Sequence, residues 1–198
     1  SQVYKHFSVN ECWYELFCIQ RWFVLKDFME RSGLGRCLAI DSDVMLYEDA
    51  FVESEQYRQY EMTTAEGFIP CYNYVRSVEG IRRFCDFLTE CYTDKKLSKA
   101  LFKEQKSMYR SGAGGVSDMV LCQWYGRAYP GRVGSLGRVE DGVVYDTNLG
   151  HEQGFEMAGL IKKIAMRDGR PYGRHMESNR WIRFIALHFQ GKSKDMIR

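Results

Sequence analysis

An apolar run that ends in acidic residues constrains the fold more than any other feature of this sequence. The letters CLAI at residues 37–40 are followed directly by Asp41, Ser42 and Asp43. Continuous apolarity predicts a central strand that is covered on both faces. In an open α/β sheet, ligands bind at the edge where the strands have their carboxyl ends. The sequence therefore predicts an α/β fold with acidic side chains at its ligand-binding edge.

The rest of the chain has alternating helical and extended patterns. Ser8 and Glu11 have the spacing of a capping box, and the helix that they open is expected to run to about Arg31. This helix is apolar over most of its surface, which predicts burial on several sides. The architecture expected is a mixed sheet flanked by helices. Its other elements are a strand at 67–75, helices at 78–92 and 117–125, and short strands at 138–139, 143–145 and 184–187.

The composition suits one domain in a reducing compartment. With 198 residues, 45% of them hydrophobic, and three prolines, the chain can bury a core without long linkers, which predicts a single domain over residues 1–198. The net charge of +2 is spread among acids, so nothing favours a nucleic acid partner. Seven cysteines without a CxxC motif predict free thiols and a cytoplasmic protein, or one peripheral to a membrane. No apolar run reaches the about 18 to 20 residues of a transmembrane segment, and none is expected.

The two acids after the first apolar run are a candidate metal site. Carboxylates at positions i and i+2 of an extended chain point to the same side. Two like charges held close together are costly unless a cation lies between them. Asp41 and Asp43 therefore offer the oxygen ligands that Mg²⁺ or Mn²⁺ prefers. A solvated turn with a capping acid is the alternative interpretation of this triplet.

A second pattern, His-x-x-Gly-x-x-Lys, follows the apolar run at 184–187. A neutral imidazole at His188 is a competent Mn²⁺ ligand. Gly191 allows a close approach of the backbone to phosphate oxygens, and the ammonium of Lys194 can neutralise a diphosphate. Each of these residues is ordinary by itself. Their order after an apolar strand, in a chain that also has Asp-x-Asp, indicates a metal–diphosphate site.

These two motifs together resemble those of the GT-A glycosyltransferases, and are most similar to glycosyltransferase family 8, the glycogenin and bacterial galactosyltransferase type. The resemblance implies a GT-A-like fold in which Mn²⁺, or Mg²⁺, is bound by both acids and the histidine. It implies that Asn73, which lies in an extended segment, contacts the donor sugar, and that Asp118, at a helix start, is catalytic. Carried over in full, the metal ligands are Asp41, Asp43 and His188, and the donor-binding residues are Asp41, Ser42, Asn73, Gly191 and Lys194.

The activity that the resemblance implies is that of a metal-dependent hexosyltransferase. It would move a sugar from a nucleotide-diphosphate donor to a glycan, protein or lipid acceptor, with retention of the anomeric configuration. The sequence departs from the family in two ways. Asp195, not tryptophan, follows the lysine, and about 36 residues precede the Asp-x-Asp strand, where the family has a βαβ unit. We therefore expect a form truncated at its N-terminus, with an open sheet edge beside residues 37–40 that favours a homodimer.

Other interpretations remain open. A haloacid-dehalogenase-type phosphatase would use Asp41 as its nucleophile and Asp43 as its acid/base. A non-catalytic remnant that binds sugar or protein would use neither. Three arginines flank Trp181 and are expected on a solvated helix face, with an acceptor groove as the alternative; they are Arg174, Arg180 and Arg183.

Overall fold

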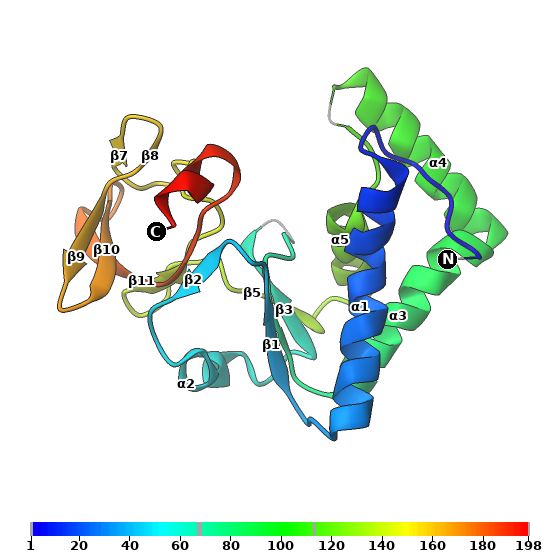
Figure 1. The fold of residues 1–198 in the computed structure, drawn as a ribbon, viewed down its shortest axis with the longest axis horizontal. Helices are drawn as coiled ribbons and strands as arrows, with labels where there is room; N and C mark the ends of the chain where they lie inside the picture. Colours follow the sequence, from blue (N-terminus) through cyan, green and yellow to red (C-terminus); the bar gives the residue numbers. More distant parts are fainter. Residues whose placement is uncertain (1, 67–68, 113, 198) are drawn as a thin grey trace. The chain divides into compact units, whose positions relative to one another are not determined.

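Helices predominate in one part of the chain and strands in the other (Figure 1). The computed structural model describes residues 2–66, 69–112 and 114–197. The chain divides into a helical unit, which comprises Ser1–Cys37, Tyr60–Met62 and Val75–Val133, and a strand unit, which comprises Leu38–Gln59, Thr63–Tyr74 and Gly134–Arg198. The protein is therefore of the mixed α/β class, as the sequence predicted.

Among the described residues, four long helices make up most of the helical unit. Helix α3 packs against α1 and α4, and α5 contacts both α1 and α3. Aromatic rings fill the centre, where Trp22 meets the edge of Phe84 at 4.9 Å between centroids and Phe84 lies 5.0 Å from Tyr125. The helices are α1 (Cys12–Ser32), α3 (Val78–Thr93), α4 (Lys95–Arg110) and α5 (Asp118–Ala128).

Two of these helices confirm the sequence prediction. Helix α3 begins after Ser77, whose hydroxyl accepts a hydrogen bond from the Gly80 amide at 3.1 Å, as expected for an N-cap. Its apolar face is buried in the core of the unit. Helix α5 corresponds to the pattern at 117–125 and runs three residues further.

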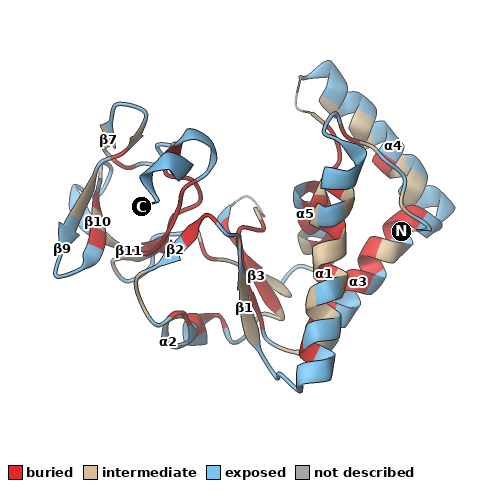
Figure 2. Cartoon of the chain, viewed as in Figure 1, coloured by how far each residue is buried: buried red, intermediate tan, exposed pale blue. Residues whose placement is uncertain are grey.

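The first helix differs from its prediction at both its start and its surface. In the described structure the Glu11 side chain makes no capping hydrogen bond, and Ser8 donates to the buried Glu15 at 2.9 Å. The expected capping box is therefore wrong, because Ser8 binds a carboxylate inside the helix. Trp13 and Phe17 are exposed, so α1 buries one face rather than several. Figure 2 shows exposed stretches along much of α1.

A four-stranded sheet has the order β1-β4-β3-β5. Strand β1 ends this order among the described strands and is only partly buried, so the prediction of a central, doubly covered strand was wrong. Strand β1 pairs with β4. Part of the extended segment expected at 67–75 forms β4, whereas residues 67–68 lie outside the described part. The strands are β1 (Cys37–Ile40), β3 (Met62–Thr64), β4 (Tyr72–Val75) and β5 (Val133–Ser135).

A five-stranded sheet carries the C-terminal part of the chain. It has the order β2-β11-β10-β9, and β6 pairs in parallel with β11. The long, largely buried β11 includes the apolar run predicted at 184–187, and β6 confirms the strand at 143–145. The strands are β2 (Val44–Leu46), β6 (Val143–Tyr145), β9 (Ile164–Arg167), β10 (Arg170–His175) and β11 (Arg180–His188).

Apolar side chains from β6, β11 and the loops around them form the core of the strand unit. Phe155 and Phe184 meet at 4.9 Å between ring centroids. The core residues are Val144, Leu149, Phe155, Ile182, Phe184, Leu187 and Phe189. Short elements complete the unit: α2 (Ala50–Glu53), the 3₁₀ helices η1 (Ser54–Tyr57) and η3 (Gly191–Met196), and the hairpin of β7 (Met157–Ala158) and β8 (Ile161–Lys162).

Two further expectations in this region were wrong. Residues 138–139 form no strand, and only Glu140 next to them forms an isolated bridge, with Val143 across the turn at Asp141 and Gly142. Arg174, Arg180 and Arg183 lie on the antiparallel strands β10 and β11 rather than on a helix face. Within the described ranges, no helix combines the length and apolarity that crossing a membrane requires.

Candidate metal centre

Asp41 and Asp43 lie in the short connection between β1 and β2. The Asp41 amide donates to the Cys71 carbonyl at 2.8 Å, and the Val44 amide donates to the Asp41 carbonyl at 3.1 Å. The second of these bonds closes a turn, with Ser42 exposed within it. The two acids thus follow the strand, as the sequence indicated, but on a turn rather than on extended chain.

Strand pairing brings His188 to these acids. His188 is the last residue of β11, and in the antiparallel register of β11 with β2 it lies opposite Val44, the residue after Asp43. The Phe189 amide also donates to the Asp43 carbonyl at 2.8 Å. The β2–β11 ladder therefore joins two motifs that lie far apart in the sequence.

The three predicted metal ligands converge. One ligand atom each from Asp41, Asp43 and His188 lie within 4.8 Å of one another. His188 Nε2 is 3.4 Å from Asp43 Oδ1. His188 is buried, Asp43 is buried at 9% exposure, and Asp41 is half-buried. Two carboxylates and an imidazole in this spacing are a donor set that fits a divalent cation such as Mn²⁺.

Lys194 reaches the same carboxylate from the 3₁₀ helix η3. Its Nζ lies 3.0 Å from Asp43 Oδ2, and its side chain is 57% exposed. A surface ion pair of this kind contributes about 0 to 1 kcal/mol to stability. The ammonium therefore lies at the solvent side of the acids, where an anionic ligand would approach.

Gly191 allows the turn that leads from β11 into η3. Its φ of 65° is left-handed, a conformation that costs a residue with a Cβ about 1 to 2 kcal/mol. A Cβ at this position would meet nothing within 4 Å. The glycine is therefore needed for its backbone angle, and the close approach to phosphate oxygens expected at this position stays a prediction.

Asn73 and Asp118 have their own partners. The Asn73 side chain is buried in β4 and donates to the Thr63 carbonyl at 2.8 Å, so its amide joins neighbouring strands. Asp118 belongs to the helical unit, where its carboxylate accepts from Arg21 at 2.7 Å. Neither residue belongs to the three-ligand cluster. The roles suggested for them at the donor sugar remain predictions.

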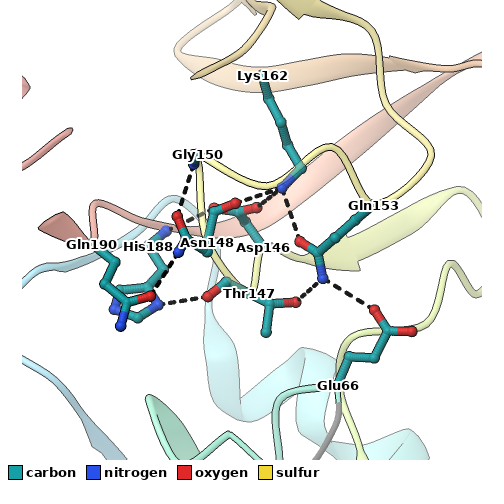
Figure 3. Close-up of polar contacts among 9 residues, drawn as sticks. All are labelled: Glu66, Asp146, Thr147, Asn148, Gly150, Gln153, Lys162, His188 and Gln190. Carbon is teal, nitrogen blue, oxygen red and sulfur yellow. Dashed lines mark hydrogen bonds and ion pairs between the residues drawn. The ribbon is translucent and has the colours of Figure 1, made fainter. Parts of the chain in front are cut away.

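Sequence reasoning missed the residues that hold His188. The Thr147 carbonyl lies 2.7 Å from His188 Nδ1, and Asp146 Oδ2 accepts the His188 backbone N–H at 3.1 Å (Figure 3). Behind them, Lys162 is buried against Asp146. Burial lowers the pKa of Lys162, and the charge of Asp146 opposes this change. The only available signal was that Asp146 follows an apolar strand, as Asp41 does.

The chain matches no protein-family model, no curated protein and no solved structure. The geometry of the three ligands is therefore the observation that bears on function.

Proposed function

We propose that this protein is a metal-dependent glycosyltransferase of the GT-A type, which transfers a hexose from a nucleotide-diphosphate donor. The convergence of Asp41, Asp43 and His188 carries the proposal. Lys194, bound to the same carboxylate, supports it because a nucleotide-diphosphate donor needs a cation beyond the metal.

The ligand types favour Mn²⁺ over Mg²⁺. Magnesium prefers oxygen ligands and retains several waters, whereas manganese also accepts imidazole nitrogen. A half-buried Asp41 leaves one side of the cluster open to a diphosphate. When bound, the metal would stabilise, as a Lewis acid, the charge that develops on the departing nucleotide diphosphate.

The chain's own residues have separate tasks in this proposal. Asp41 and Asp43 balance the charge of the cation, and His188 presents Nε2 toward Asp43. Lys194 donates to a phosphate oxygen and so orients the leaving group. Gly191 allows the chain to turn after His188, and this turn brings Lys194 close to Asp43. Preorganised charges of this kind commonly contribute several kcal/mol to transition-state stabilisation.

Donor hydrolysis tests the proposed function. The protein is incubated with Mn²⁺ and a panel of nucleotide-diphosphate sugars, and slow release of nucleoside diphosphate is expected even without acceptor. Asp43→Asn removes one charge from the metal ligands, and the rate should fall roughly 100-fold or more. Asp168→Asn is the matched control, because Asp168 is exposed on a β-turn with φ of 50°, which asparagine tolerates.

Other outcomes would favour the rival activities. Mg²⁺-dependent release of phosphate from a simple ester, abolished by Asp41→Asn, would indicate the dehalogenase-type phosphatase. Binding of a sugar without turnover of any donor would indicate a non-catalytic module. Equal donor hydrolysis by the wild type and Asp43→Asn would contradict the glycosyltransferase proposal.

A further inference from the structure

A buried ion pair lies behind the metal ligands. Lys162 Nζ is 2.7 Å from Asp146 Oδ1, and the two side chains are 1% and 0% exposed. Removing two charges from water costs several kcal/mol, which a buried pair regains only with good geometry and further hydrogen bonds. In proteins, replacing such a pair by apolar residues of similar volume is often neutral or stabilising. The position of this pair therefore requires a reason other than stability.

Every donor of the ammonium is used within one loop. Besides Asp146, Lys162 donates to the Asn148 carbonyl at 2.7 Å and to Gln153 Oε1 at 2.9 Å. Gln153 in turn donates to the hydroxyl of Thr147 and, at 3.1 Å, to Glu66 (Figure 3). Lys162 thus holds Asp146 and Asn148, the residues on both sides of Thr147, by hydrogen bonds. Gln153 holds the Thr147 side chain through its hydroxyl.

The same loop is hydrogen-bonded along the end of β11. The Asp146 amide donates to the Ala186 carbonyl at 3.0 Å, and the Leu149 amide donates to the His188 carbonyl at 2.9 Å. The second carboxylate oxygen of Asp146 accepts the His188 backbone N–H at 3.1 Å. A single carboxylate therefore joins the buried lysine to the main chain of the histidine.

This arrangement determines which nitrogen of His188 carries the proton. The Thr147 carbonyl can only accept, so Nδ1, at 2.7 Å from it, must be the protonated nitrogen. The lone pair of the neutral ring is then on Nε2, the atom 3.4 Å from Asp43. A metal-binding histidine needs this assignment, and a hydrogen bond to its other nitrogen usually supplies it.

We propose that the Lys162–Asp146 pair positions His188: it holds the loop from Asp146 to Asn148 so that the Thr147 carbonyl orients the ring and keeps Nε2 available as a ligand. The inference rests on the proposed metal site. Lys162 and Asp146 are positioning residues, and neither touches the metal or the donor. Loss of a residue that orients a ligand typically weakens metal affinity about 10- to 100-fold.

The tautomer of His188 is a direct readout that needs no metal. The chain has four histidines, so the ring nitrogens of the ¹⁵N-labelled protein can be resolved by long-range proton–nitrogen correlation, with His188→Gln for assignment. In the wild type, measured with neutral rings, we expect a single tautomer protonated at Nδ1. In Lys162→Met with Asp146→Leu, we expect a mixture of tautomers and a Mn²⁺ dissociation constant about 10- to 100-fold higher.

A matched pair on the surface provides the control. Lys163 Nζ lies 2.7 Å from Glu156 Oε1, one residue along from Lys162 but exposed. Lys163→Met with Glu156→Leu should leave both the tautomer and the Mn²⁺ affinity unchanged. If the buried double variant does not fold, Asp146→Asn replaces it, because one amide oxygen can serve the lysine or the His188 N–H but not both.

The outcomes separate this inference from the proposed function. A wild type that binds no Mn²⁺ but has His188 protonated at Nδ1 would defeat the metal site and leave the orientation by Thr147 standing. A wild-type ring protonated at Nε2 would overturn the positioning. The positioning would also be overturned if the folded Lys162→Met, Asp146→Leu variant kept both the wild-type tautomer and the wild-type Mn²⁺ affinity. The same result in Asp146→Asn, where that variant is used instead, would overturn it too.

Discussion

At the scale of single residues, the Asp43 carboxylate contacts both the histidine and the lysine of the site. One oxygen faces His188 Nε2 at 3.4 Å and the other lies 3.0 Å from Lys194 Nζ. Its main-chain carbonyl accepts from Phe189, so its backbone is fixed to the segment that follows β11. The side chains around Asp43 thus differ in burial: His188 is buried and hydrogen-bonded on its far side, whereas the side chain of Lys194 is more than half exposed.

Lys194 should affect the donor far more than the fold. In Lys194→Met, we expect the free energy of unfolding to change by less than about 1 kcal/mol, because the side chain is more than half exposed. The apparent affinity for the nucleotide-diphosphate sugar should fall roughly 10- to 100-fold, as expected when a charged hydrogen bond worth about 1.5 to 3 kcal/mol is lost. Donor titrations with Mn²⁺ present measure this effect.

Lys192→Met is the control for this experiment. Lys192 is exposed in the same 3₁₀ helix, two residues before Lys194. Its removal takes the same charge from the chain, so any general electrostatic effect would be equal in the two variants. Equal donor affinities for both variants would contradict the role given to Lys194.

At the scale of elements, β11 connects the core of the strand unit to the metal ligands. Phe184 and Leu187 lie in the apolar core, and His188 ends the strand beside Asp43. Across the ladder, Gly173 of β10 pairs with Ile182. A Cβ at Gly173 would lie 2.7 Å from a ring carbon of Phe184, so β10 and this ring approach each other too closely for any other residue.

Gly173→Ala should destabilise the protein by about 1 to 3 kcal/mol, because an overpacked core forces its side chains or backbone to move. The displaced Phe184 lies four residues before His188, so Mn²⁺ affinity should fall as well. Urea unfolding and Mn²⁺ titration measure the two effects. Gly35→Ala is the control, since a Cβ there meets nothing within 4 Å. A Gly173→Ala protein as stable as Gly35→Ala would show that this packing is wrong.

Local patterns predicted several of these elements. The helical repeat gave α3 because Ile81, Phe84, Cys85 and Leu88 share one buried face, and the apolar run at 184–187 gave the interior of β11. Pairing between distant strands could not be predicted in this way. The apolar letters of β1 were taken for a central strand, although β1 lies at the end of its sheet. The sequence also gives no sign that Lys162 pairs with Asp146, although Asp146 follows an apolar strand.

At the scale of the whole molecule, the chain is organised as two units, and every residue of the three-ligand cluster belongs to the strand unit. Lys194 and the Lys162–Asp146 pair belong to it too. Asp118 belongs to the helical unit and is bound by Arg21 there. The sequence motifs identified the cluster because each motif places its acid or histidine at the end of a strand. No feature of the amino-acid composition indicated that the chain divides into two units.

Nitrogen coupling to bound Mn²⁺ tests the central claim most directly. Pulsed electron paramagnetic resonance of the protein with one equivalent of Mn²⁺ detects a coordinated imidazole through its ¹⁴N nucleus. We expect coupling from one imidazole in the wild type and in His151→Gln, whose exposed histidine lies in the same unit. The coupling should disappear in His188→Gln. Mn²⁺ that binds without nitrogen coupling, or coupling that persists in His188→Gln, would contradict a metal centre formed by Asp41, Asp43 and His188.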